Sequence, residues 1–78
     1  MGSIEPLQGL IDPKVYRILQ VFLANRERLY HLHSVSQEAK VPVSTTFRVV
    51  NRLLKLKLIT IVPVGKMKLY RLVAGVQL

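Results

Sequence analysis

Residues 44–59 place the strongest constraint on the fold, because their polarity repeats with the period of an α-helix. On a wheel with about 100° per residue, the apolar side chains fill one half: Phe47, Val49, Val50, Leu53, Leu54 and Leu56. The polar side chains gather in an arc of roughly 120° on the other side: Ser44, Thr45, Arg48, Asn51, Arg52 and Lys55. The segment therefore predicts a helix with one half in a core and the other in solvent.

The polar arc carries three cations, an amide and two hydroxyls, and it has no carboxylate. These groups suit phosphate oxygens and the base edges of a DNA major groove. The alternative is an ordinary solvated helix face, but such a face normally mixes both signs, often in pairs four residues apart. The missing acid favours contact with a nucleic acid.

The net charge of the 78-residue chain is +8, and it is unevenly placed. The acids all lie in the first half of the chain: Glu5, Asp12, Glu27 and Glu38. Eight lysines and arginines lie between residues 39 and 78 with no acid among them. The positive field of this half attracts polyanions, so DNA is the first candidate partner, RNA the second and an anionic membrane surface the third.

Length and composition limit the class of protein. A chain of 78 residues allows one domain, and the lack of cysteine excludes disulfides and thiolate metal sites. No apolar run reaches the roughly 20 residues that span a bilayer, and the N-terminus lacks a signal pattern. We expect an intracellular, cytoplasmic protein associated with the nucleoid. Half of the residues are hydrophobic, more than a small basic domain needs for its core, which indicates self-association.

The first half of the chain predicts a core helix behind an N-terminal arm. Residues 1–11 form the expected arm, whose Met1–Ser3 are either native or left from cloning. Asp12 and Pro13 are a strong helix start. A helix over 13–25 follows, with an apolar stripe at helical spacing: Val15, Ile18, Leu19, Phe22 and Leu23.

A short strand over 29–33 and a short helix over 35–40 are expected next. His31 and His33 would share one strand face, but two histidines fall short of the three or four ligands usual for zinc, so we expect no metal. The run from Ser34 to Gln37 matches a capping box before the short helix. Pro42 then stops this helix, and Ser44 caps the basic one. This is the order of a helix-turn-helix unit.

The end of the chain changes to the period of strands. Two apolar runs flank Gly65 and Lys66, which suits a type II′ hairpin. That register pairs Val64 with Met67, Val62 with Leu69, and Thr60 with Arg71. The predicted core face consists of Ile59, Ile61, Tyr70 and Leu72, and the opposite face is unusually apolar. Pro63 indicates an edge strand, and residues 74–78 are read as a tail.

Residues 12–73 are similar to the winged helix-turn-helix domains of prokaryotic transcription regulators, of the archaeal or viral type. Members often carry a loose Ser-Thr-hydrophobic-aromatic-Arg-x-Leu-x-x-Leu pattern, which aligns here without gaps from Ser44 to Leu53. Lys57-Leu58-Ile59 stands where members have Gly-Leu-Ile or Gly-Leu-Val, and Tyr70-Arg71-Leu72 resembles the end of their wing. The departures from the pattern include Lys57, which replaces the glycine at the helix end, and Thr46, which replaces an aliphatic core residue.

The resemblance implies an α+β fold with three helices and a two- to three-stranded antiparallel sheet. It implies that helix 44–57 lies in the major groove of DNA and that hairpin 58–73 is the wing. The expected DNA-binding residues then lie on the helix and the wing: Ser44, Thr45, Arg48, Asn51, Arg52, Lys55, Lys66 and Lys68.

We therefore expect a sequence-specific double-stranded DNA-binding transcription regulator that acts as a homodimer. The alternative is a winged-helix adaptor module that binds proteins, which the apolar surplus would also suit. RNA or single-strand binding is less favoured, because Phe22, Phe47 and Tyr70 are predicted in the core and leave no aromatic for stacking. We expect no enzyme, cofactor, membrane contact or small-molecule ligand, since no catalytic or phosphate-binding motif is present.

Overall fold

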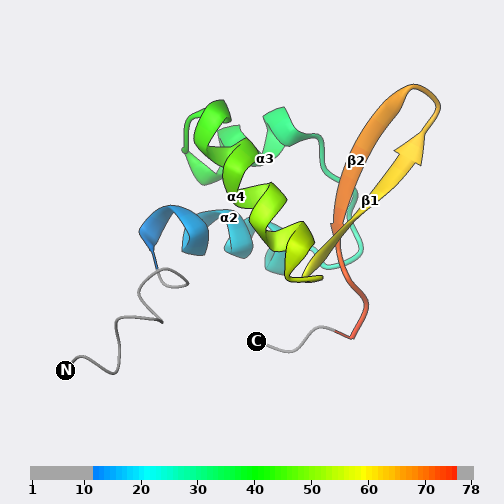
Figure 1. Cartoon of the computed structure of the whole chain (residues 1–78), viewed down its shortest axis with the longest axis horizontal. Coiled ribbons are helices and arrows are strands. Elements are labelled where there is room, and N and C mark those ends of the chain that lie inside the picture. The colour runs from blue at the N-terminus through cyan, green and yellow to red at the C-terminus, as the bar shows by residue number, and fades with distance from the viewer. Residues whose placement is uncertain (1–11, 76–78) are drawn as a thin grey trace.

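The computed structural model describes residues 12–75 and contains, over these residues, three helices followed by a hairpin (Figure 1). The elements in chain order are α2 (Pro13–Ala24), α3 (Leu32–Ala39), α4 (Val43–Lys55), β1 (Ile59–Val64) and β2 (Met67–Leu72). This confirms the predicted α+β class. The predicted arm over 1–11 and the last three residues of the predicted tail lie outside the described residues.

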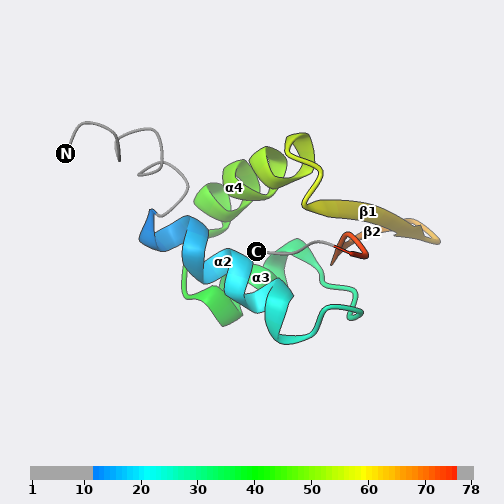
Figure 2. The same cartoon turned by 90° about the horizontal axis from the view of Figure 1, so that it is seen from below.

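The three helices pack together, and the hairpin extends away from them (Figures 1 and 2). None of the helices in the described part of the chain is long and apolar enough to cross a membrane. The core lies between α2, α3, α4 and the base of the hairpin, and its largest fully buried side chains include Tyr30, Phe22, Ile18 and Leu53.

Helix α2 begins as predicted. The Asp12 carboxylate accepts a hydrogen bond from the Lys14 backbone N–H at 2.8 Å, and Pro13 occupies the first turn. Such a cap satisfies one of the free N–H groups at the helix start, and proline loses no bond there. The helix buries a stripe at helical spacing: Val15, Ile18, Val21 and Phe22.

Helix α3 begins earlier than predicted, and the strand expected over 29–33 is wrong. Only Tyr30 pairs with the sheet, through an isolated bridge to Tyr70. The helix starts at Leu32, its N-cap His31 makes no side-chain cap bond, and Ser34 lies inside the helix. Leu32 packs against the core on the same face as the fully buried Val35. Burial of that extra leucine outweighs the capping bond that Ser34 would have made.

The turn between α3 and α4 is closed by bonds in both directions. Val41 donates its N–H to the Ser36 carbonyl at 3.1 Å, and the Ser36 hydroxyl donates to the Val41 carbonyl at 2.6 Å. The Thr46 hydroxyl, fully buried, donates to the same carbonyl at 3.4 Å. This contact explains why a threonine stands where the related pattern has an aliphatic residue.

Helix α4 begins at Val43 with Pro42 as its N-cap residue, so the prediction that Ser44 caps it is wrong. Pro42 has φ −54° and its carbonyl accepts the Thr46 N–H at 2.9 Å. Proline has this φ fixed by its ring, so it directs the chain into the helix without a side-chain cap.

The end of α4 is formed by the lysine that replaces the glycine of the related pattern. The helix ends at Lys55, and Lys57 adopts a left-handed φ of 62°. The Lys57 N–H bonds the Leu54 carbonyl and the Leu58 N–H bonds the Leu53 carbonyl, each at 3.0 Å. This pair of bonds is a Schellman motif, in which glycine is usually the left-handed residue.

The hairpin has the predicted register. Val64 pairs with Met67, Val62 with Leu69 and Thr60 with Arg71. Gly65 has φ +60°, while Lys66 is not among the residues of positive φ, as a type II′ turn requires.

The position of Pro63 in this register does not disturb the hydrogen bonds between β1 and β2. From a two-residue turn outward, hydrogen-bonded pairs alternate with non-hydrogen-bonded pairs. Pro63 and Lys68 form a non-hydrogen-bonded pair, whose backbone N–H and C=O groups face away from the partner strand. The missing N–H of Pro63 therefore costs no ladder bond and weakens only the open edge of β1.

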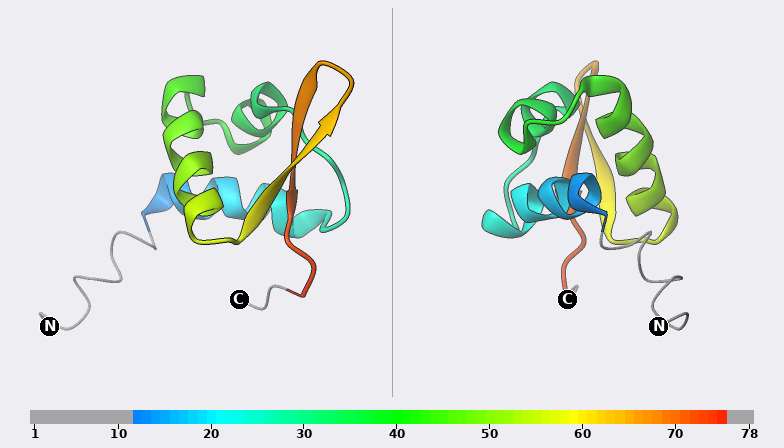
Figure 3. Two further views of the ribbon diagram at one scale, coloured as in Figure 1. Left: turned by 45° about the vertical axis from the view of Figure 1, so that its right-hand side comes forward. Right: turned by 90° about the vertical axis from the view of Figure 1, so that its left-hand side faces the viewer.

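The predicted core face of the hairpin is correct at Ile59, Tyr70 and Leu72 but wrong at Ile61, which is 40% exposed. Conversely, Leu69 was assigned to the outer face and is only 9% exposed. Strand β2 lies between β1 and the Tyr30 bridge, so its side chains are flanked on two sides. Strand β1 has an open edge, and the hairpin extends away from the helices (Figure 3).

Replacing Lys57 with glycine should stabilise the protein. A left-handed conformation costs a residue with a Cβ roughly 1–2 kcal/mol, and the greater freedom of glycine in the unfolded chain offsets part of the gain. We expect Lys57→Gly to raise the free energy of unfolding in urea by roughly 0.5–1 kcal/mol. The matched control is Lys55→Gly at the last residue of α4, where the backbone is helical, so this variant should lower the free energy of unfolding by up to about 1 kcal/mol. A loss of stability in Lys57→Gly would contradict the left-handed cap.

Candidate nucleic-acid interface

The outward face of α4 brings together six of the predicted site residues. Ser44, Arg48, Arg52 and Lys55 are exposed, whereas Thr45 and Asn51 are half-buried at the edges of the face. The opposite face of the helix is the part that enters the core, and it buries Thr46, Val49, Val50 and Leu53. The core therefore fixes the rotation of α4, which leaves three cations, an amide and two hydroxyls accessible.

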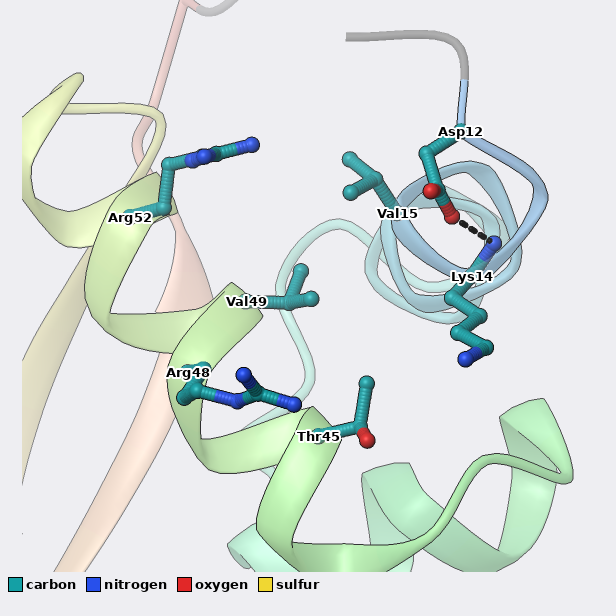
Figure 4. Close-up of a pocket in the computed structure, with 7 residues that line it drawn as sticks. All are labelled: Asp12, Lys14, Val15, Thr45, Arg48, Val49 and Arg52. Carbon is teal, nitrogen blue, oxygen red and sulfur yellow. Dashed lines mark hydrogen bonds between the residues drawn. The ribbon is translucent and has the colours of Figure 1, made fainter. Parts of the chain in front are cut away.

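A cleft of about 310 Å³ lies where the start of α2 approaches α4. In Figure 4 the side chains of Thr45, Arg48 and Arg52 extend from α4 toward Asp12 and Lys14 at the other wall. Val15 and Val49 form its apolar floor. The cleft thus combines three cationic side chains with one carboxylate.

Lys14 is a residue of this cleft that the sequence analysis did not assign. It lies 34 positions before Arg48 in the chain (48 − 14), and no local pattern joins the two. Only the packing of α2 against α4 brings them together. Three cations face the single carboxylate of Asp12, so the cleft is predominantly cationic and suits a phosphate oxygen.

The hairpin presents the other two predicted residues. Lys66 and Lys68 are exposed at its tip, far from the helices (Figures 1 and 3). The structure thus does not join them to the α4 face in one continuous patch. Instead it offers two cationic regions, linked by the short connection from α4 into β1.

The prediction that Phe47 lies in the core is wrong, since its side chain is 51% exposed. The buried arc of α4 is narrower than half of the wheel and centres on Thr46, Val50 and Leu53. Phe47 lies about 100° from Thr46, at the margin of that arc. Tyr16 on α2 is exposed as well. The argument against single-strand binding, which required buried aromatics, therefore no longer holds.

Metal-binding side chains do not cluster in the described part of the chain. Within residues 12–75, no three histidine, cysteine, aspartate or glutamate residues lie close enough to hold an ion. His31 and His33 are both exposed at the start of α3, where they do not share the strand face that was expected.

A solved structure shares this arrangement of helices and hairpin. It is that of the ferric uptake regulator from Francisella tularensis with iron, with a TM-score of 0.71 and 22% sequence identity over 85% of this chain. The chain described here has the winged-helix fold. It spans only 54% of the length of that regulator, so the likeness concerns the fold alone.

Two other comparisons gave no match. No family model matches the chain, and no curated protein matches it. The archaeal or viral type that the sequence pattern resembles therefore has no support, whereas the winged helix does.

Truncating Phe47 should cost much less stability than truncating a core phenylalanine. We expect Phe47→Ala to lower the free energy of unfolding by about 1–2 kcal/mol, because half of the ring is already in water. Phe22→Ala, at a fully buried position, should lose about 3–5 kcal/mol. Urea unfolding of both variants provides the measurement. Equal losses in the free energy of unfolding would show that Phe47 is a core residue.

Proposed function

We propose that this chain binds double-stranded DNA sequence-specifically and acts as a transcription regulator in the cytoplasm, on the nucleoid. In this proposal α4 lies in the major groove and hairpin 58–73 serves as the wing. The observation that carries it is the outward face of α4, which combines cations, an amide and hydroxyls without a carboxylate. A chain free of acids from residue 39 onward adds the long-range attraction to phosphate.

The side chains of α4 suit distinct roles. Arg48 or Arg52 can contact the two acceptors of guanine, and Asn51 can contact adenine in the same bidentate way. The hydroxyls of Ser44 and Thr45 suit bases or phosphates. An α-helix with its side chains is about 10–12 Å across, so α4 fits a major groove about 12 Å wide. At about 1.5 Å per residue, its 13 residues give a length of about 20 Å.

The remaining lysines supply affinity without sequence information. Lys55 at the end of α4, Lys66 and Lys68 on the hairpin, and Lys14 at the cleft are all exposed. Each phosphate that such a side chain neutralises releases counterions and makes binding depend on salt. The fold that this chain shares with a protein named a ferric uptake regulator supports a regulatory role. The iron in that structure belongs to that protein, and we propose none here.

A second candidate function is a protein-binding adaptor. It is favoured by large apolar side chains that stay exposed on α4 and the hairpin: Phe47, Leu56, Ile61, Val64 and Met67. Salt separates the two functions. Binding to DNA weakens with a log–log slope of about 0.9 per phosphate neutralised, whereas burial of apolar surface against a protein does not weaken with salt in this way.

Selection of bound sequences from a random duplex pool at moderate salt tests the proposal directly. We expect enrichment of a defined sequence whose affinity falls steeply as salt rises. Failure to enrich any sequence, with binding that is equal for all duplexes, would overturn sequence-specific recognition. Failure to bind any duplex at low salt would favour the adaptor.

Replacing Arg48 with alanine should cost affinity at one base pair of the selected site. A bidentate contact to guanine is worth about 1–3 kcal/mol of discrimination. We expect Arg48→Ala to bind the selected site and a variant with that guanine replaced equally well, in fluorescence anisotropy titrations. Lys55→Ala is the control, because a phosphate contact should weaken both duplexes alike. A variant Arg48→Ala that still discriminates between the duplexes would refute the assignment.

We also propose that the chain acts as a homodimer, and a measurement can decide this. A two-fold dimer binds two half-sites about 34 Å apart, one turn of DNA. We therefore expect the selected sequence to be an inverted repeat with that spacing, and sedimentation at high protein concentration to give twice the chain mass. A single half-site together with a monomeric mass would show that one chain acts alone.

A further inference from the structure

The tip of the hairpin carries a pair of apolar side chains that nothing in the described chain covers fully. Val64 and Met67 are cross-strand neighbours on either side of the Gly65-Lys66 turn. They remain 43% and 48% exposed. The pair shares its face with the half-buried Val62 and the buried Leu69, so the exposed apolar surface on this face is concentrated at the end of the hairpin.

Cations flank this apolar pair. Lys66 lies in the turn between the two side chains, and Lys68 follows Met67 directly; both are exposed. No acid follows residue 38 anywhere in the sequence. A partner of the tip must therefore be anionic and must also offer an apolar surface within a few ångströms of its charges.

A second copy of this chain does not meet that requirement. Two tips in contact would bring the same lysines together, in chains that each carry a net charge of +8, and like charges at close range repel. Pairing of two β1 edges is opposed by Pro63, which has no N–H to donate on the open side of the strand.

Duplex DNA meets the requirement for an anionic partner with apolar surface, because the faces of stacked bases are apolar and lie between two rows of phosphates. We propose that the hairpin tip enters the minor groove and inserts Val64 and Met67 at a base step, which it partly unstacks and bends. This inference rests on the proposed function, since α4 must first dock in the neighbouring major groove. Apolar wedges flanked by cations are a known means of kinking DNA through the minor groove.

The dimensions of the hairpin agree with this placement. Each strand has six residues, so at about 3.3 Å per residue the hairpin reaches about 20 Å from its base. The minor groove lies about half of the 34 Å turn, roughly 17 Å, from the major groove that α4 would occupy. A two-residue turn is also the narrowest end a hairpin can have, which suits a groove about 6 Å wide.

The test uses the full chain and the duplex selected from the random pool. Adenines of the base pairs that line the minor groove beside the α4 site are replaced one at a time by 2-aminopurine. The fluorescence of 2-aminopurine rises when it unstacks from its neighbours. Dyes at the two ends report bending by energy transfer. We expect a fluorescence rise at one step, strongest where that step is a flexible pyrimidine–purine step, and a bend of about 20–90°.

The decisive variant carries Val64→Ser and Met67→Ser together. It should abolish the fluorescence rise and the bend while it still binds the duplex with an unchanged salt slope. Because both side chains are largely exposed, an unchanged melting temperature verifies that the variant folds. The matched control Lys66→Ser should keep the fluorescence rise and lower the salt slope by about 0.9, one phosphate contact.

Three results would overturn the wedge. If the wild-type chain binds the duplex without unstacking or bending it, the wedge is wrong and DNA binding stands. If the double variant unstacks the step as well as wild type, another part of the chain is responsible. If the chain binds no duplex but binds vesicles of anionic phospholipid, and the double variant does not, then both the proposed function and the wedge fail.

Discussion

The position of the wing depends on one antiparallel bridge between Tyr30 and Tyr70. Each residue donates its N–H to the other's carbonyl at 2.8 Å. The Tyr30 ring, almost fully buried, also donates its hydroxyl to the Val21 carbonyl at 3.0 Å and packs edge-on against Phe22. Tyr30 thus connects α2, through its side chain, to β2, through its backbone. Because β1 continues directly from α4 and pairs with β2, the bridge fixes the direction in which the hairpin leaves the helices.

The features that sequence analysis predicted correctly are those decided by neighbours along the chain. The hairpin register follows from Gly65, since a two-residue turn with a left-handed first residue leaves a single pairing of the flanking strands. The start of α2 follows from Asp12 and Pro13 in the same way. The related pattern marks the end of α4, because Lys57 stands in place of its glycine; that Lys57 itself takes the left-handed conformation is a finding of the structure.

The features that it missed depend on packing between distant segments. Leu32 joins α3 because the core accepts its side chain, which the capping pattern at Ser34 cannot reveal. Phe47 was placed in the core because a wheel assigns half of a helix to it, but the width of the buried arc depends on how closely neighbouring helices approach. Lys14 meets Arg48 only through the crossing of α2 and α4. No periodicity within one segment carries that information.

The apolar surplus of the chain takes a different meaning once its location is known. In the sequence it indicates self-association, but apart from Tyr16 on α2 the large exposed apolar side chains lie on or directly beside α4 and the hairpin, which also carry exposed lysines and arginines. A protein partner for these side chains would have to bury or neutralise the cations beside Phe47 and Met67, at a considerable cost in desolvation. DNA presents base faces and thymine methyl groups between phosphates, so it accommodates both kinds of side chain at once. The content of apolar residues alone would suit an adaptor. The position of the exposed apolar side chains beside the cations favours double-stranded DNA instead.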